Sequence, residues 1–299
     1  MHRLNICLLM FFVLFTGCFP ACAEPEPMVF VSILPQKYLV QQVGKDLVHV
    51  EVMVQPGASP ATYEPKPSQM RKLKSSSVYF AIGVPFEQAW LTRISRMNPQ
   101  MTVVHTDAGV TKRAMKKDYS DALTHDEAHP ADGHFHEGLD PHIWLSPPLV
   151  KQQVVVIRQT LEQLLPNEKH MLRKNEQQLL ELIDDLDRKL QKMFSNLQDK
   201  RFLVFHPTWG YFADHYGLEQ IAIEIEGKSP KPAQLRQLIG YARKNDIRVI
   251  FVQPQFSVKS AEIVAKELDG RMVTADPLAG DWLMNMEKVG AAFVEVLRK

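Results

Sequence analysis

The apolar positions of this 299-residue chain form short runs that alternate with amphipathic helical patterns. Short apolar runs bounded by polar, Gly or Pro residues predict strands. The predicted strands are residues 29–34, 48–54, 78–82 and 102–104 in the first half, and 202–205, 221–225, 249–252 and 272–275 in the second. Strand–helix alternation predicts parallel sheets covered on both faces. The fold class is therefore α/β, with two lobes, each a four-stranded, mainly parallel sheet flanked by helices.

Helical spacing of apolar residues separates these runs. The predicted helices are residues 38–43, 68–73, 87–96, 233–244, 257–268 and 282–297. A much longer pattern, without Gly or Pro, spans residues 167–197, where Leu179, Ile183, Leu186 and Leu190 recur at steps of three and four. At 1.5 Å per residue this helix would be roughly 45 Å long. We expect it to be a rigid strut joining the lobes; a coiled-coil dimerisation helix is the alternative.

The domain organisation follows from the position of this helix. We expect an N-terminal lobe over residues 28–166, a linking helix over 167–197 and a C-terminal lobe over 200–299. The length suits two domains with separate cores.

The first 23 residues are typical of a cleavable export signal. Arg3 precedes an apolar run, and Ala21-Cys22-Ala23 forms a small-residue cleavage site. The run is shorter than the about 20 residues that cross a bilayer. We therefore expect a periplasmic protein; a lipid anchor at Cys18 is the alternative.

All three cysteines of the chain lie in this leader, namely Cys7, Cys18 and Cys22. Cleavage would leave no thiol for a disulfide or a metal site, so ligands must come from His, Asp and Glu. The leader also holds Arg3, and removing it from the 35 basic residues leaves 34 against 34 acidic ones. This balance argues against a nucleic-acid partner. We expect a monomer.

One segment, residues 122–138, combines histidine and carboxylate side chains with almost no aliphatic ones. Its histidines are His125, His129, His134 and His136. Such a composition cannot form a core and predicts a surface loop. We interpret it as an auxiliary metal-binding loop; a solvated loop of accidental composition is the alternative.

Three metal-capable residues lie where strands end or helices begin. His206 directly follows the strand 202–205, Asp276 follows 272–275, and His142 lies just before a helix. Ligands of parallel sheets bind beyond the carboxyl ends of the strands. Two imidazoles and a carboxylate would suit zinc or another first-row metal. Asp140, two residues before His142, could orient that imidazole.

Five segments resemble the zinc and manganese substrate-binding proteins of ABC importers. They are PGASPATYEPKP (56–67), GVPFEQAW (83–90), DPHIWLSP (140–147), HPTWGYFADHYG (206–217) and ADPL (275–278). The resemblance runs from Val29 to the C-terminus. It implies two lobes bridged by a long helix, one metal ion in the cleft between them, and an ABC permease in the inner membrane as partner.

The resemblance also implies ligand positions. His142, His206 and Asp276 stand at three of them, but Ala61 stands where the family has its remaining histidine. Glu64 is the nearest replacement, and water or a loop histidine could serve instead. Zinc is the expected ion, with Mn2+ or Fe2+ possible. Two alternative functions remain: a lipid-anchored, adhesin-like metal-binding protein, and a metal-dependent hydrolase using the open coordination position.

The leader generates the first prediction. Export should yield a mature chain that begins at Glu24, because the small-residue site ends at Ala23. Intact-mass measurement of the exported protein checks this. An acylated species beginning at Cys18 would instead establish the lipoprotein alternative.

Overall fold

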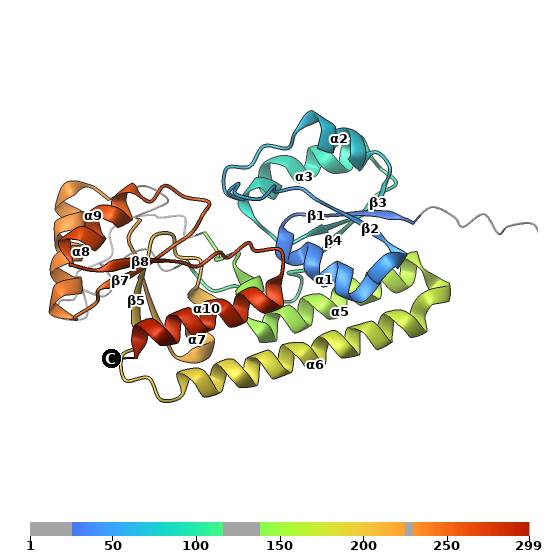
Figure 1. Cartoon of the computed structure of the whole chain (residues 1–299). Coiled ribbons are helices and arrows are strands. Elements are labelled where there is room, and N and C mark those ends of the chain that lie inside the picture. Colours follow the sequence, from blue (N-terminus) through green and yellow to red (C-terminus); the bar gives the residue numbers. More distant parts are fainter. Residues whose placement is uncertain (1–25, 116–137, 225–229, 299) are drawn as a thin grey trace, which may run out of the picture.

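The computed structural model describes residues 26–115, 138–224 and 230–298. Its elements form two lobes, each built on a parallel four-stranded sheet, as predicted (Figure 1). The leader and most of residues 122–138 lie outside the described residues. No helix in the described part of the chain combines the length and the apolar character needed to cross a bilayer.

The N-terminal lobe has the strand order β2-β1-β3-β4. Its strands are β1 (Met28–Val31), β2 (His49–Val52), β3 (Ser76–Ala81) and β4 (Thr102–His105), and its helices are α1 (Leu34–Gly44), α2 (Pro67–Leu73), α3 (Pro85–Met97) and α5 (Pro147–Leu164). Prolines open α2, α3 and α5, where the missing N–H would have no partner in any case. The predicted strand 29–34 ends earlier, because Pro35 lies in the first turn of α1.

The C-terminal lobe repeats the arrangement with the order β6-β5-β7-β8. Its strands are β5 (Arg201–Val204), β6 (Glu219–Ala222), β7 (Val249–Val252) and β8 (Arg271–Thr274), and its helices are α7 (Gly210–Tyr216), α8 (Pro232–Lys244), α9 (Lys259–Glu267) and α10 (Trp282–Leu297). The short helix α7 was not predicted from the sequence. Gly217, at φ 66°, ends it in the left-handed conformation that glycine tolerates.

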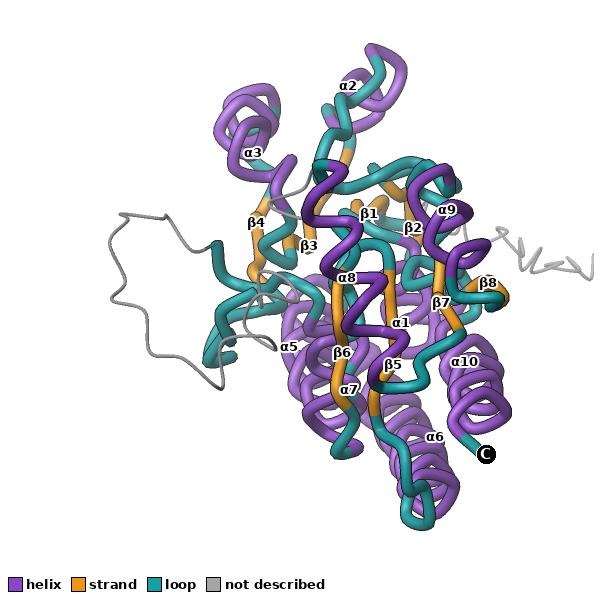
Figure 2. Tube along the Cα trace, turned by 90° about the vertical axis from the view of Figure 1, so that its left-hand side faces the viewer, coloured by secondary structure: helices purple, strands orange, loops and turns teal. Residues whose placement is uncertain are grey.

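The long helix α6 (Lys169–Phe194) runs beneath both lobes (Figure 1). The apolar stripe of α6 is buried against α1 and α5 of one lobe and α7 and α10 of the other. Short 3-10 turns over Lys45–Leu47, Ile143–Leu145 and Pro166–Glu168 complete the elements. Viewed along the molecule, α5, α6 and α10 lie together on one side of the sheets (Figure 2). The stripe is thus covered within one chain, as a strut requires.

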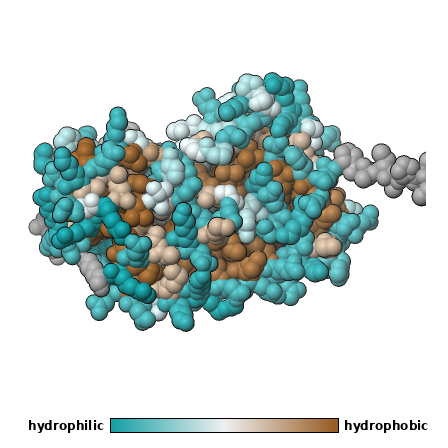
Figure 3. All heavy atoms as spheres, viewed as in Figure 1, coloured by the Kyte–Doolittle hydropathy of each residue, from teal (hydrophilic) through white to brown (hydrophobic). Residues whose placement is uncertain are grey.

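The two lobes share one core. A single cluster of buried side chains runs from the N-terminal sheet through α6 to the inner face of the C-terminal sheet. Successive side chains of a strand point to opposite faces of the C-terminal sheet. Phe202 and Val204 of β5 therefore face this shared core, while Leu203 faces a smaller cluster under α8 and α9. The lobes therefore do not have fully separate cores, although the C-terminal lobe keeps the smaller cluster as its own. Apolar residues also show on the surface over the middle of the molecule, where α1, α5 and α10 lie (Figure 3).

The approach of α10 to α6 depends on a glycine. A Cβ atom built on Gly290 would lie 2.2 Å from Cδ2 of Leu190, a side chain that is fully buried. Near the opposite end of α6, the Asn175 side-chain amide donates to the Val43 carbonyl at the end of α1, at 2.9 Å. The helix is thus tied to a different lobe at each end.

The shared core generates a stability prediction. Replacing Leu190 by Ala should lower the free energy of unfolding by about 2–5 kcal/mol, because the cavity opens between α6 and α10. One cooperative transition is expected in urea, since both lobes use the same core. Leu182→Ala is the control, because this leucine of α6 is 44% exposed. Two separate transitions would show that the lobes unfold independently.

Candidate metal centre

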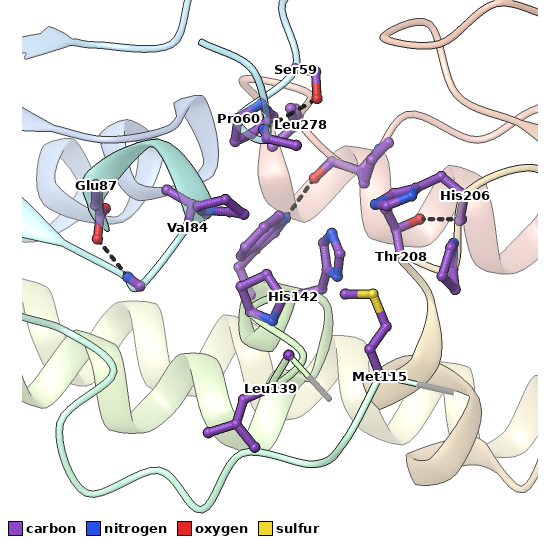
Figure 4. Close-up of a pocket in the computed structure, with 18 of the residues that line it drawn as sticks. Ser59, Pro60, Val84, Glu87, Met115, Leu139, His142, His206, Thr208 and Leu278 are labelled. Carbon is purple, nitrogen blue, oxygen red and sulfur yellow. Dashed lines mark hydrogen bonds between the residues drawn. The ribbon is translucent and has the colours of Figure 1, made fainter. Parts of the chain in front are cut away.

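The carboxyl ends of both parallel sheets face a cavity of about 980 Å³ between the lobes. Its walls include residues that follow β3, β5, β6 and β8, together with the 142–144 segment (Figure 4). The position agrees with the rule that ligands bind beyond the carboxyl ends of parallel strands.

His142 and His206 meet in this cavity, one from each half of the chain. Their ring centroids are 5.5 Å apart and the rings are nearly perpendicular, at 73°. His142 is only 7% exposed. The structure therefore brings together two of the residues singled out in the sequence.

Each imidazole is held by a carboxylate. Nδ1 of His142 lies 2.7 Å from Oδ1 of Asp140, which also accepts the backbone N–H of His142 at 3.0 Å. Nδ1 of His206 lies 2.5 Å from Oε1 of Glu224. A carboxylate at Nδ1 fixes the ring and leaves Nε2 available to a metal ion, the arrangement of carboxylate–histidine–zinc sites.

Burial also favours the ligating form of His142. Loss of water lowers the pKa of this imidazole, and the adjacent His206 lowers it further, whereas Asp140 and Glu224 act in the opposite direction. The net shift is downward. Because only a neutral imidazole binds a metal, protons compete less with the metal at this residue than at an exposed histidine.

The surroundings of His206 fix its backbone and its ring. Gln253 donates to the His206 carbonyl at 2.6 Å and accepts its backbone N–H at 3.3 Å. Phe256 stacks on the imidazole, with centroids 4.5 Å apart. Little conformational entropy is therefore left for a metal ion to remove.

Two tryptophans connect the lobes beside His142. The indole N–H of Trp144 donates to the Pro277 carbonyl, and that of Trp282 donates to the Trp144 carbonyl, both at 2.7 Å. The Trp144 ring also contacts His142, at 5.1 Å between centroids. The segment that carries His142 is thus fixed to the loop between β8 and α10.

A short antiparallel stem, residues 113–115 paired with 138–140, rests on α7 of the C-terminal lobe. The Tyr211 hydroxyl accepts the Arg113 N–H at 3.0 Å and donates to the Asp140 carbonyl at 2.9 Å. The Arg113 guanidinium pairs with Asp214 at 2.6 Å. A Cβ on Gly210 would lie 2.7 Å from Nη1 of Arg113, so glycine permits this contact. The stem holds Asp140, and through it His142.

Asp276 is placed differently from the histidines. Its Oδ1 accepts the Gln255 side-chain amide at 2.7 Å and the backbone N–H of Leu278 at 2.9 Å. Its neighbours Pro277 and Leu278 line the cavity, while Asp276 is not among the lining residues.

The remaining residues predicted for the site are Ala61, Glu64 and the histidines of residues 122–138. Ala61 lines the cavity, whereas Glu64 is exposed and lies outside the lining. Within residues 26–115, 138–224 and 230–298, no three His, Asp or Glu side chains are grouped closely enough to hold an ion. His125, His129, His134 and His136 lie outside the described residues, although Met115 and Gly138, which flank them, line the cavity.

Several residues of the site were missed from the sequence. Glu224 lies just after β6, Gln253 and Gln255 lie just after β7, and His105 ends β4. Their positions at strand ends were a usable signal, because the same rule selected His206. The contacts of Glu224 and Gln253 with His206, and of Gln255 with Asp276, depend on the strand order, which no local pattern encodes.

Comparison with known proteins identifies the family. The sequence model of the family described as zinc-uptake complex component A, periplasmic, matches residues 29–296. The chain belongs to this family.

Similar relatives agree with this membership. The chain is 28% identical over 273 residues to the high-affinity zinc uptake system protein ZnuA of Yersinia pestis, covering 87% of this chain and 85% of that protein. A crystal structure of ZnuA matches it with a TM-score of 0.83 and 38% identity, covering 91% of this chain and 100% of the other. A ZnuA deletion mutant with zinc bound gives 0.82 and 36%, covering 92% and 99%.

Membership confirms the general function predicted from the sequence. The chain is a periplasmic, zinc-binding substrate-binding protein that delivers metal to an ABC importer, and the importer's permease is its partner. The family consists of solute-binding proteins, so the hydrolase alternative is not supported.

The carboxylate partner of His142 generates a prediction. Asp140→Ala should weaken zinc binding about 10–100-fold, because Nδ1 loses the group that orients the ring. Removing Asp140 also removes an effect that raises the pKa of His142, so the loss should persist between pH 7 and 8.5. Competition titration with a chromophoric chelator measures it.

Two variants test this interpretation of Asp140. Asp140→Asn keeps a hydrogen-bond acceptor and should lose less zinc affinity than Asp140→Ala. The control is Asp185→Asn, on an exposed part of α6, which should leave the zinc affinity unchanged. A loss that disappears at the higher pH would point to protonation of His142 and contradict the orienting role.

Proposed function

We propose that His142 and His206 form the core of the zinc site and that Nε2 of each binds the ion. The observation that carries the proposal is their contact across the cavity, with Asp140 and Glu224 holding the two Nδ1 atoms. Imidazole suits zinc better than manganese, which prefers carboxylate and water oxygens. Mn2+ and Fe2+ are weaker candidates for the same two atoms.

Asp276 is the proposed third protein ligand. Its neighbours line the cavity and its partner Gln255 is itself in the wall. Turning the Gln255 amide away would free the Oδ1 atom for a metal ion. Glu64 is a weaker proposal for the fourth ligand, because its side chain is exposed and does not line the cavity. A water molecule beside Ala61 is favoured as the fourth ligand.

The remaining parts of the proposal concern organisation. We propose an N-terminal lobe over 28–166, a linking helix over 167–197 and a C-terminal lobe over 200–299, because the first and last segments each hold one four-stranded sheet. The shared core joins the two lobes. The histidines of residues 122–138 are proposed to collect metal near the cavity, since the flanking Met115 and Gly138 line it. The covered stripe of α6 supports a monomer, and the balanced charge supports the absence of a nucleic-acid partner.

The histidine pair generates the central test. His142→Ala and His206→Ala should each abolish tight zinc binding, because the remaining imidazole and Asp276, two protein ligands, do not hold the ion against water. Ala61→His should strengthen binding, because residue 61 lines the same cavity and the variant adds a nitrogen donor. Calorimetric titration with ZnCl2 measures all three variants.

The matched control is His49→Ala. His49 is an exposed histidine of β2 that does not line the cavity, so its removal should leave zinc affinity unchanged. Equal affinity in the wild type and in both His142→Ala and His206→Ala would place the metal site elsewhere.

A further inference from the structure

Asp276, the proposed third ligand, stands apart from the cavity between the lobes. His142 and His206 line the cavity, whereas Asp276 does not. Within the described ranges, no three His, Asp or Glu side chains are grouped closely enough to hold an ion. For Asp276 to become a ligand, its carboxylate must therefore move toward the histidine pair.

The backbone around Asp276 is fixed, so this movement falls to the side chain. The Asp276 carbonyl accepts the side-chain amide of Asn285 in α10, at 2.7 Å. The next carbonyl, that of Pro277, accepts the indole N–H of Trp144 from the other lobe, also at 2.7 Å. Two hydrogen bonds thus hold consecutive peptide groups at this point. The carboxylate can still move by rotation about the single bonds of its own side chain.

Two donors hold the carboxylate in its present position. Oδ1 of Asp276 accepts the backbone N–H of Leu278 at 2.9 Å and the side-chain amide of Gln255 at 2.7 Å. The Leu278 donor belongs to the same chain segment and closes a local turn. The Gln255 donor comes from the segment after β7, on a long side chain with several rotatable bonds. Of these two donors, Gln255 is the one that can leave without a change in the backbone.

The amide of Gln255 is incompletely satisfied while it holds Asp276. Its Oε1 atom is buried and has no hydrogen-bond partner among the described residues. A buried acceptor without a partner costs free energy. Gln255 itself lines the cavity, which at about 980 Å³ has ample room for water. Turning the amide toward the cavity would let water donate to Oε1, and this gain would partly offset the loss of the bond to Asp276.

From these contacts we infer that Gln255 competes with the metal ion for Asp276 and so keeps the zinc affinity below what the ligands alone would give. The inference rests on the proposed function, since it takes Asp276 as the third ligand. Without metal, the Gln255 amide holds Oδ1 of Asp276 outside the cavity. When zinc binds, the amide turns away and the carboxylate joins the histidine pair. On delivery, the amide takes the carboxylate back, which favours release of the ion.

The sign of an affinity change tests this inference. Gln255→Leu keeps much of the bulk of the side chain but cannot donate a hydrogen bond to Asp276. The affinity for ZnCl2 should rise about tenfold, because a hydrogen bond to a charged group is lost from the metal-free state alone. A residue that instead supported Asp276 in the bound state would lower the affinity when removed. Competition titration with a chromophoric chelator measures the affinity, and stopped-flow transfer of zinc to the chelator should show slower release.

Thermal unfolding gives a readout that a packing defect would not reproduce. The Gln255–Asp276 bond stabilises only the metal-free protein, so Gln255→Leu should lower the melting temperature without zinc and leave it unchanged at saturating zinc. Gln255→Asn should behave as Gln255→Leu, because the shortened amide does not reach Oδ1. The matched control is Gln88→Leu, since Gln88 lines the cavity from α3 of the other lobe; its zinc affinity should equal that of the wild type.

A double-mutant cycle connects the effect to Asp276. Asp276→Ala should weaken zinc binding, and in that background Gln255→Leu should have no further effect. If Asp276→Ala weakens binding while Gln255→Leu leaves the affinity unchanged or lowers it, the inference is overturned and the proposed function stands. If Asp276→Ala leaves the zinc affinity unchanged, Asp276 is not a ligand, and both the third-ligand proposal and this inference are overturned.

Discussion

The burial of one face of α6 by both lobes is the interaction on which the rest of the structure depends. Leu179, Ile183 and Leu186 in the middle of the helix, and Leu190 near its end, place their side chains in a core that both sheets share. Each fully buried leucine stabilises the fold by about 1.5–3 kcal/mol relative to an exposed one. Because a helix is stiff and both lobes are packed on it, the distance between the two sheets is fixed. That distance determines how closely His142 and His206 approach.

Local contacts give this spacing the geometry of the proposed metal site. The strut alone would place the two histidine-bearing segments opposite each other without orienting their rings. The carboxylates of Asp140 and Glu224 orient the rings, and the Trp144–Pro277 hydrogen bond fixes the His142 segment to the loop between β8 and α10 of the other lobe. Both carboxylates lie within the fold, so the orientation exists before metal arrives. Binding then costs little rearrangement, and the affinity reflects the number of donors.

Much of the fold could be predicted from the sequence, because its signals are local. The eight strands of the described residues each overlap a predicted apolar run, although β6 shares only Ile221 and Ala222 with its run, and α6 lies within the predicted long helix. His206 was found because it directly follows a strand. The placement of Asp276 was not predictable, because the backbone N–H of Leu278 and the Gln255 side chain capture its carboxylate, and Gln255 comes from a neighbouring strand end. The sharing of one core was missed for the same reason: length and composition do not reveal which faces meet.

The chemistry of the histidine pair also bears on metal choice. A site with several protein carboxylates can hold manganese, whose preferred ligands are oxygens, whereas the proposed set of two imidazoles and one carboxylate favours zinc. Ala61 lines the cavity without supplying a nitrogen or an oxygen donor, so it adds nothing that would shift the proposed site toward manganese. In the proposed site, the remaining donors would determine the affinity, while the two oriented imidazoles would determine the class of metal.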